Sequence, residues 1–401
     1  MKEAYIVDAI RTPIGVLGGG LSPVRADDLA AHVIRSLVGR HPDLDLAAID
    51  DVVLGCAGQA GEDNRNVARM AALLAGLPVS VPGETVNRLC ASGMSAAIHA
   101  AHAIAANAGD VFITGGVEQM TRSPWVMSKA SKPFGRDAEM FDSTFGWRFV
   151  NPMMQEKFGT EGMGETAENL LETQNITRED QDKFAMWSQQ KAAAAQREGR
   201  LGREIAPVHI PQRKMDPIIF DKDEFIKPDT TMAVLAGLRP AFRKNGSVTA
   251  GNSSGLNDGA AAMLIASGAG MKANGMMPLA RIVSSGVAGV EPRIMGIGPV
   301  HASAIALKRA GLKLEQMDVI ELNEAFAAQA LACTRTWGIA DNDPRLNPNG
   351  GAIALGHPLG MSGARLLQAA ALELHRTQKR YALCTMCIGV GQGYATVIER
   401  A

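Results

Sequence analysis

The feature that most constrains this chain is an internal repeat. Short β-prone runs begin at Asp51 in the first third and at Asp318 in the last third. Cys90 follows the first run by 39 positions (90 − 51), and His357 follows the second by the same 39 (357 − 318). Two copies of one α/β unit can pair so that equivalent helix starts converge. The repeat therefore predicts that Cys90 and His357 meet in space.

Each copy is predicted to contain a strand, a helix and a second strand, in that order. After the first strand come Ala-rich helices predicted at residues 92–108 and 360–376, because their apolar residues recur at helical spacing. Strand-like runs follow at residues 110–114 and 381–385. The chain is therefore expected to be an α/β protein with two similar cores.

The middle of the chain has a different composition. Residues 121–250 are rich in Pro, Trp and charge, with one helix expected over 165–198 between irregular loops. Such an insertion beside a paired core can form the wall of a ligand site. Three parts are thus predicted: a first core of residues 1–120 with 251–278, an inserted loop domain of residues 121–250, and a second core of residues 279–401.

Composition excludes several kinds of protein. Forty basic residues balance forty-one acidic ones, so no overall field attracts nucleic acid or an anionic membrane. No apolar run approaches the roughly 20 residues that cross a bilayer, and the first residues lack the pattern of an export signal. Five cysteines without paired spacing argue against a disulfide framework. A cytoplasmic enzyme with free thiols is expected.

Cys90 and His357 have the local settings of reactive groups. Cys90 precedes a predicted helix, whose free N–H groups and dipole are expected to lower the pKa of its thiol and favour a nucleophilic thiolate. Taken alone, it could equally be a small buried core residue. Gly356 and Pro358 flank His357, so the backbone bends there and presents the imidazole.

Two further residues come from the same repeat. Cys387 opens a Gly-rich turn whose N–H groups could face a bound oxygen, and its thiol could move protons, although an ordinary turn would look the same. Asn323 follows the strand of the second copy and could be only a helix N-cap. No role is assigned to the remaining cysteines or to the other histidines considered, which are Cys56, Cys333, Cys384, His99, His102, His209, His301 and His375.

Four segments together resemble the signature blocks of thiolases: residues 87–95, 323–326, 356–360 and 387–391. Further matching blocks lie at residues 8–13, 163–168 and 249–255. The resemblance spans nearly the whole chain. It implies a thiolase-like fold with layers in the order αβαβα, a homodimer or homotetramer, and coenzyme A as co-substrate without a metal or a bound cofactor.

The resemblance also implies roles for individual residues. Cys90 would form the acyl-enzyme, His357 would activate its thiol, and Cys387 would act as acid and base at the α-carbon. Asn323 would hold a water that completes one oxyanion hole with His357. The backbone N–H groups of Cys90 and Gly389 would form the other oxyanion hole.

Contacts to coenzyme A are implied less specifically. Ser254 would line the pantetheine channel, with Met163 and Met295 as further contacts, and the inserted domain would hold the nucleotide end. Lys227 is a candidate for a phosphate contact, but a solvated lysine is an equal alternative because other basic residues lie near it in the sequence, namely Lys222, Arg239, Arg243 and Lys244.

The substrate is suggested by departures from the short-chain biosynthetic members at Gly162 and Glu165. There the chain is more similar to thiolases that cleave 3-oxoadipyl-CoA into succinyl-CoA and acetyl-CoA. A substrate carboxylate favours an arginine partner, and three candidates stay unranked: Arg88, Arg122 and Arg148. Alternatives are acetyl-CoA acetyltransferase or fatty-acid 3-ketoacyl-CoA thiolase activity, a non-catalytic thiolase-like carrier, and a cysteine hydrolase.

Overall fold

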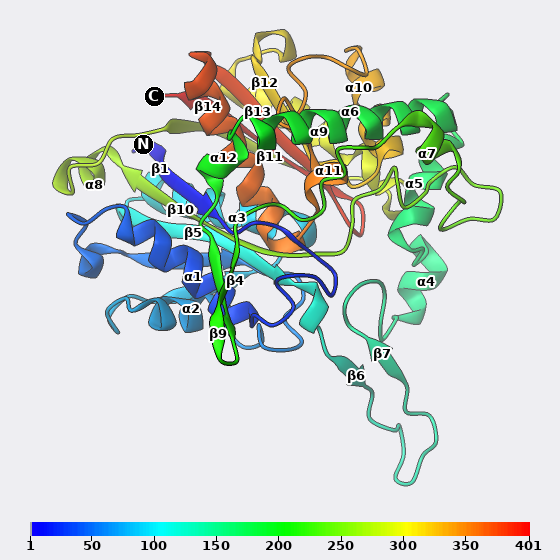
Figure 1. Cartoon of the computed structure of the whole chain (residues 1–401), viewed down its shortest axis with the longest axis horizontal. Helices are drawn as coiled ribbons and strands as arrows, with labels where there is room; N and C mark the ends of the chain where they lie inside the picture. Colours follow the sequence, from blue (N-terminus) through cyan, green and yellow to red (C-terminus); the bar gives the residue numbers. More distant parts are fainter. Residues whose placement is uncertain (1) are drawn as a thin grey trace.

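One mixed sheet forms the centre of the protein in the computed structural model, which describes residues 2–401 (Figure 1). Its ten strands are β1 (Ala4–Arg11), β2 (Gly15–Val16), β3 (Asp51–Gly55), β4 (Gly83–Val86), β5 (Val111–Gln119), β10 (Asn257–Ser267), β11 (Ala280–Gly289), β12 (Val319–Leu322), β13 (Tyr381–Ile388) and β14 (Gln392–Arg400). They lie in the order β12-β13-β14-β11-β1-β10-β5-β3-β4, with β2 paired to β10.

The internal repeat is visible in this order. Moving outward from the middle, β1, β10, β5 and β3 on one side correspond to β11, β14, β13 and β12 on the other. In both halves the outer pair is parallel, β3 with β5 and β12 with β13. Across the middle of the sheet, β1 pairs with β11 through Tyr5 with Arg281 and Ile6 with Ala280. The predicted duplication of one α/β unit is confirmed.

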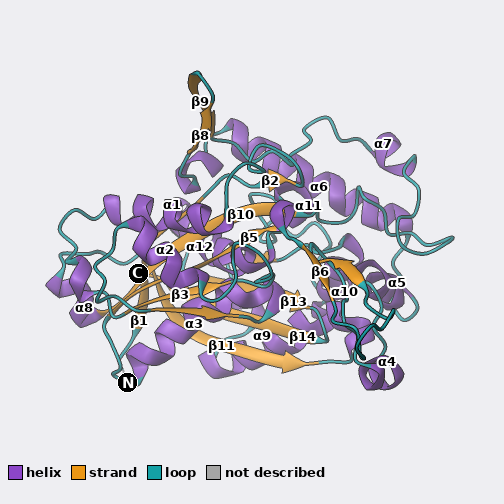
Figure 2. Cartoon of the chain, turned by 90° about the horizontal axis from the view of Figure 1, so that it is seen from below, coloured by secondary structure: helices purple, strands orange, loops and turns teal. Residues whose placement is uncertain are grey.

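Helices cover the sheet in layers (Figure 2). Helices α1 (Ala26–Gly39) and α2 (Val67–Ala75) lie on the outer face of the first half, while α9 (Gly298–Ala310) and α10 (Ala327–Trp337) lie outside the second. Between the halves, α3 (Ser92–Ala105) and α12 (Leu359–Thr377) pack against each other and against strands of the sheet. The layers therefore follow the expected order αβαβα.

The two central helices approach closely because small residues face each other. A Cβ atom on Gly93 would lie 2.6 Å from the carbonyl oxygen of Gly360, and one on Gly363 would lie 2.4 Å from the backbone nitrogen of Met94. Any larger side chain would separate the backbones. Glycine at these positions lets the starts of α3 and α12 meet, which brings the segments just before them together.

The middle of the chain packs against α10 through its longer helices and projects from the body. Its elements are β6 (Trp125–Met127), β7 (Met140–Asp142), α4 (Pro152–Phe158), α5 (Met163–Leu171), α6 (Arg178–Arg197), β8 (Val208–Gln212), β9 (Met215–Phe220) and α7 (Met232–Ala236). The single helix predicted over 165–198 is wrong in one respect. It is broken before α6, because Thr177 and Asp180 form a capping box that starts a new helix.

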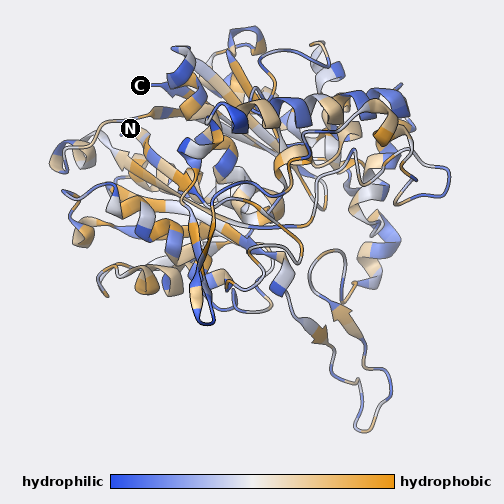
Figure 3. Ribbon diagram, viewed as in Figure 1, coloured by the Kyte–Doolittle hydropathy of each residue, from blue (hydrophilic) through white to orange (hydrophobic). Residues whose placement is uncertain are grey.

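Two hairpins extend outward. The β6–β7 arm leaves the body near α4 (Figure 1) and carries apolar residues along with polar ones (Figure 3). The β8–β9 hairpin leaves on the side of α1. The remaining helices are short, α8 (Gly268–Ala273) and α11 (Ala352–Leu355). Within residues 2–401, none of the helices is long and apolar enough to span a membrane.

Candidate active site

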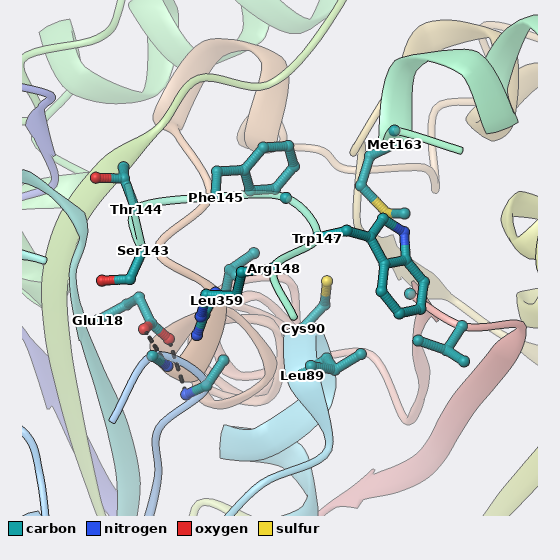
Figure 4. Close-up of a pocket in the computed structure, with 16 residues that line it drawn as sticks. Leu89, Cys90, Glu118, Ser143, Thr144, Phe145, Trp147, Arg148, Met163 and Leu359 are labelled. Atoms are coloured by element: carbon teal, nitrogen blue, oxygen red, sulfur yellow. Dashed lines mark hydrogen bonds between the residues drawn. The ribbon is translucent and has the colours of Figure 1, made fainter. Parts of the chain in front are cut away.

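Cys90 lies in a single 3-10 turn, Leu89–Ala91, directly before α3. Leu89 has a φ of +46°, in the left-handed region, which costs a non-glycine residue conformational energy. The Ser92 hydroxyl holds this turn, since it accepts a hydrogen bond from the N–H of Arg88 at 2.9 Å and donates one to the Leu89 carbonyl at 2.7 Å. The turn aims the Cys90 thiol into a cavity (Figure 4).

The predicted effect of the helix start on this thiol is wrong in its net direction. Burial raises the pKa of the Cys90 thiol to about 11, because a thiolate loses hydration there. The backbone N–H groups of Gly389 and of Cys90 itself lower the pKa as expected, but by less than burial raises it. Cys90 therefore rests as a thiol, and forming the nucleophile requires a base.

His357 supplies a neutral imidazole. Its backbone N–H donates to Asn257 Oδ1 at 2.9 Å, and its Nδ1 lies 2.6 Å from the Ser362 hydroxyl, which in turn donates to the Pro358 carbonyl at 2.8 Å. Since that hydroxyl proton is already used, Nδ1–H is the donor and Nε2 keeps its lone pair. Burial, together with the nearby positive charge of Arg365, lowers the pKa of His357 to about 3.

Asn323 stands beside this imidazole. The helix-cap alternative is wrong, because α10 begins only at Ala327 with Phe326 at its N-cap. Asn323 instead follows the end of β12, where its Nδ2 lies 3.3 Å from His357 Nε2. Its Oδ1 is buried and has no hydrogen-bond partner within residues 2–401, so it is a free acceptor next to this imidazole.

Cys387 lies one residue before the end of β13, buried beside Cys90. Burial raises the pKa of its thiol well above the usual value, and proximity to Cys90 adds to the rise. The following turn to β14 uses left-handed conformations at Val390 (φ +63°) and Gly391 (φ +78°). A side chain on Gly391 would clash with the Val290 carbonyl, so this turn keeps its shape and holds the Gly389 N–H against Cys90.

Two cavities meet at Cys90. The first, about 200 Å³, is lined by Cys90, His357 and Cys387 together with mainly apolar groups. The second, about 220 Å³, leads away from Cys90 beneath the loop that connects β7 to α4 (Figure 4). Phe145, Met163 and Leu359 also line both cavities. The structure thus joins the two reactive residues of the repeat in one site, as the equal offsets predict.

The predicted contact residues are only partly brought together. Ser254, Met163 and Met295 all line the cavity that contains His357. The exposed Lys227 does not line it, and its ammonium lies 5.3 Å over the ring of Phe225 instead. A Cβ atom on Gly255, which does line the cavity, would lie 2.7 Å from that ring. Lys227 is therefore near the rim and not inside.

Sequence analysis missed the residues that support these groups. Ser362 was not considered, although a hydroxyl five positions after His357, in the first turns of a helix, is a detectable signal. Glu118 is a second case, a buried carboxylate at the end of β5 that accepts hydrogen bonds from the N–H groups of Ala57, Gly58 and Gly360. Burial raises its pKa to about 7. Nothing local in the sequence around Glu118 indicates these partners.

Removing the Glu118 carboxylate should loosen the site. In Glu118→Ala, one buried and two half-buried N–H groups lose their acceptor, which is expected to cost on the order of 3 kcal/mol and to lower the thermal unfolding midpoint. Calorimetry at one fixed protein concentration checks this. Glu84→Ala, an exposed glutamate on β4, is the matched control, and an equal midpoint in both variants would contradict the assigned role.

The residues without a predicted role lie outside the two cavities. All five cysteines are free, as expected. Cys333 and Cys384 are buried donors to the carbonyl groups of Gly296 and Leu366. Cys56 packs near Asp63 and Glu118.

The histidines without a predicted role also lie outside the cavities. His99, His102, His209 and His301 are exposed, while His375 contacts the Leu279 carbonyl.

The layered fold and its Cys–His–Cys site define an acyl-transferring enzyme, and family comparison agrees. The chain matches the thiolase N-terminal domain over residues 4–269 and the thiolase C-terminal domain over residues 276–400, so it belongs to the thiolase family. It is thus an acyltransferase of the thiolase type. Use of coenzyme A as co-substrate fits this family.

Individual relatives are similar over their full length. The chain is 62% identical over 400 residues, covering 100% of both chains, to the 3-oxoadipyl-CoA/3-oxo-5,6-dehydrosuberyl-CoA thiolase of Escherichia coli strain K12. It is 57% identical, again over 100% of both, to a beta-ketoadipyl-CoA thiolase of Acinetobacter baylyi. The crystal structure of the Bacillus anthracis acetyl-CoA acetyltransferase superposes with a TM-score of 0.92 at 40% identity, covering 100% of this chain and 99% of that one.

Proposed function

We propose that this thiolase cleaves 3-oxoadipyl-CoA with coenzyme A to give succinyl-CoA and acetyl-CoA, in the breakdown of aromatic compounds. The observation that carries the proposal is the full-length similarity, at 62% and 57% identity, to proteins named for this substrate. The site supports it, since Cys90, His357 and Cys387 line one cavity.

The first half-reaction forms an acyl-enzyme. Nε2 of neutral His357 takes the proton of the Cys90 thiol, and the sulfur attacks the 3-keto carbon of the substrate. The bond between C2 and C3 then breaks, and its electron pair goes to the acetyl-CoA enolate. Cys387, protonated because burial raises its pKa, gives its proton to C2. Acetyl-CoA leaves, and the succinyl group stays on Cys90 as a thioester.

The second half-reaction restores the enzyme. The thiol of a new coenzyme A gives its proton to the Cys387 thiolate and attacks the thioester carbon. The Cys90 sulfur leaves and recovers its proton from His357. Each thioester is exchanged for another. A sulfur nucleophile therefore keeps the intermediate close in free energy to both the substrate and the product.

Two sets of donors would stabilise the developing oxyanions. The N–H groups of Cys90 and Gly389 lower the pKa of the Cys90 thiol, which places both near its sulfur. The second set would be His357 with a water held by Asn323, whose Oδ1 is a free buried acceptor. Two holes suit a substrate with two carbonyl groups.

The other contacts are proposed from position. Ser254, Met163 and Met295 would contact the pantetheine end in the cavity with His357. Lys227, near the rim, would contact a phosphate. The inserted loop domain, residues 121–250, would hold the nucleotide end. The other two domains would be the first core, residues 1–120 with 251–278, and the second core, residues 279–401. We also propose a cytoplasmic homodimer or homotetramer, which the mass in solution and cell fractionation test.

The substrate proposal predicts an order of rates. Cleavage of 3-oxoadipyl-CoA is expected to have a kcat/KM at least about tenfold above that of acetoacetyl-CoA, because the longer acyl group fills the second cavity and gains binding there. The measurement is coenzyme A-dependent cleavage of a panel of 3-ketoacyl thioesters. A tenfold preference for acetoacetyl-CoA would instead indicate an acetyl-CoA acetyltransferase, and turnover without coenzyme A would indicate a hydrolase.

A further inference from the structure

We infer that Arg148 binds the terminal carboxylate of the acyl group and so determines the preference for dicarboxylic 3-ketoacyl thioesters. This inference rests on the proposed function. Arg148 lies in the loop between β7 and α4 and lines the second cavity together with Cys90 (Figure 4). After attack by Cys90, the acyl tail consists of two methylene groups and a carboxylate.

The two cavities differ in charge. The cavity with His357 and Cys387 contains no lysine, arginine, aspartate or glutamate. The second contains one basic side chain, Arg148, and one acidic side chain, Glu118. Three backbone N–H groups already hold the Glu118 carboxylate, and no ion pair joins it to Arg148 within residues 2–401. A carboxylate entering this cavity from Cys90 therefore meets Arg148 as its only cationic partner.

The guanidinium of Arg148 is uncommitted. Within the part of the chain that the structure describes, it makes no ion pair and no side-chain hydrogen bond, although it is half-buried. The other two candidates are already engaged. Arg122 pairs with Glu62 at 2.6 Å. Arg88 donates to Ser95 Oγ at 3.0 Å and lies over the Tyr394 ring, and it lines neither cavity.

The loop holds Arg148 in place through its neighbours. On one side, Trp147 Nε1 donates to the Glu161 carbonyl at 3.2 Å. On the other, Phe149 packs edge-on against Phe141 with ring centroids 5.0 Å apart. Phe149 also has a φ of +50°, a conformation that a bulky residue keeps only when its surroundings fix it. Such anchoring reduces the entropy lost when Arg148 binds a carboxylate.

The test compares two substrates of equal length on one protein preparation. 3-Oxoadipyl-CoA carries the carboxylate, and 3-oxohexanoyl-CoA carries a methyl group in its place. In Arg148→Met, kcat/KM for 3-oxoadipyl-CoA is expected to fall about 10- to 100-fold, the range for a lost charge-assisted hydrogen bond. For 3-oxohexanoyl-CoA it should change less than about threefold, which also shows that the variant folds. Arg148→Lys should recover part of the preference.

The control is Arg213→Met, the same substitution in the exposed turn between β8 and β9, which should leave both rates unchanged. If the wild type prefers 3-oxoadipyl-CoA and Arg148→Met keeps that preference, the role of Arg148 is overturned while the proposed function stands. If the wild type shows no preference for the carboxylate substrate, the proposed function fails, and the inference fails with it.

Discussion

In Cys90→Ser, thiolytic cleavage is expected to fall by on the order of 10⁴-fold or more. A serine hydroxyl is far less acidic than a thiol, so His357 removes its proton far less readily. The acyl-enzyme would also be an oxygen ester, whose free energy differs from that of the substrate and product thioesters. Steady-state rates with 3-oxoadipyl-CoA and coenzyme A measure the loss.

Intact mass provides a second readout for the same variant. Wild-type protein incubated with 3-oxoadipyl-CoA, without free coenzyme A, should gain the mass of one succinyl group, and Cys90→Ser should not. Cys384→Ser is the matched control, because that buried thiol faces the Leu366 carbonyl and lines neither cavity. An adduct and near-normal turnover in Cys90→Ser would exclude Cys90 as the nucleophile.

In His357→Ala, kcat is expected to fall about 10²- to 10⁴-fold, the usual contribution of a general base. The pH dependence should change as well. Without the imidazole, Cys90 reacts only as its thiolate, whose fraction grows as pH rises toward the thiol pKa of about 11. Alkylation of Cys90 by iodoacetamide should therefore accelerate about tenfold per pH unit between about pH 7 and 10.

Cleavage by the wild type should not show this dependence on pH. His357 stays neutral above its pKa of about 3, and Cys90 stays protonated below about 11, so neither group titrates between these values. Cleavage should thus show no inflection from this pair near neutrality. His301→Ala, an exposed histidine on α9, is the control. A flat alkylation profile in His357→Ala, at the wild-type rate, would rule out His357 as the base.

Much of the fold could be predicted because its signals are local. Helical and strand periodicity located the starts of β3, α3, β5, β12, α12 and β13 to within one residue, although β5 runs five residues past its predicted end. The equal offsets to Cys90 and His357 also predicted their meeting, since duplicated units pack with their equivalent ends together. The break before α6 was missed, although Thr177 and Asp180 form a recognisable cap.

Local sequence predicted which residues meet in one cavity, but not their protonation. Local sequence assigned Cys90 a lowered thiol pKa, whereas its burial by residues distant in the chain raises the pKa. The local sequence of Asn323 is compatible with a helix cap, whereas in the structure its Nδ2 lies 3.3 Å from His357 Nε2. Arg88, Arg122 and Arg148 could not be ranked, because their partners, or the absence of partners, depend on contacts between separate segments.

The sequence by itself determined the duplicated α/β architecture, the thiolase family and which side chains of the repeat meet, because periodicity and motif spacing are properties of neighbouring residues. Tertiary structure alone decided the protonation of Cys90 and His357, the support from Ser362 and Glu118, and which of the three arginines lines a cavity with Cys90. Desolvation and pairing depend on what surrounds an atom in space, and the surrounding groups come from segments that lie far apart along the chain.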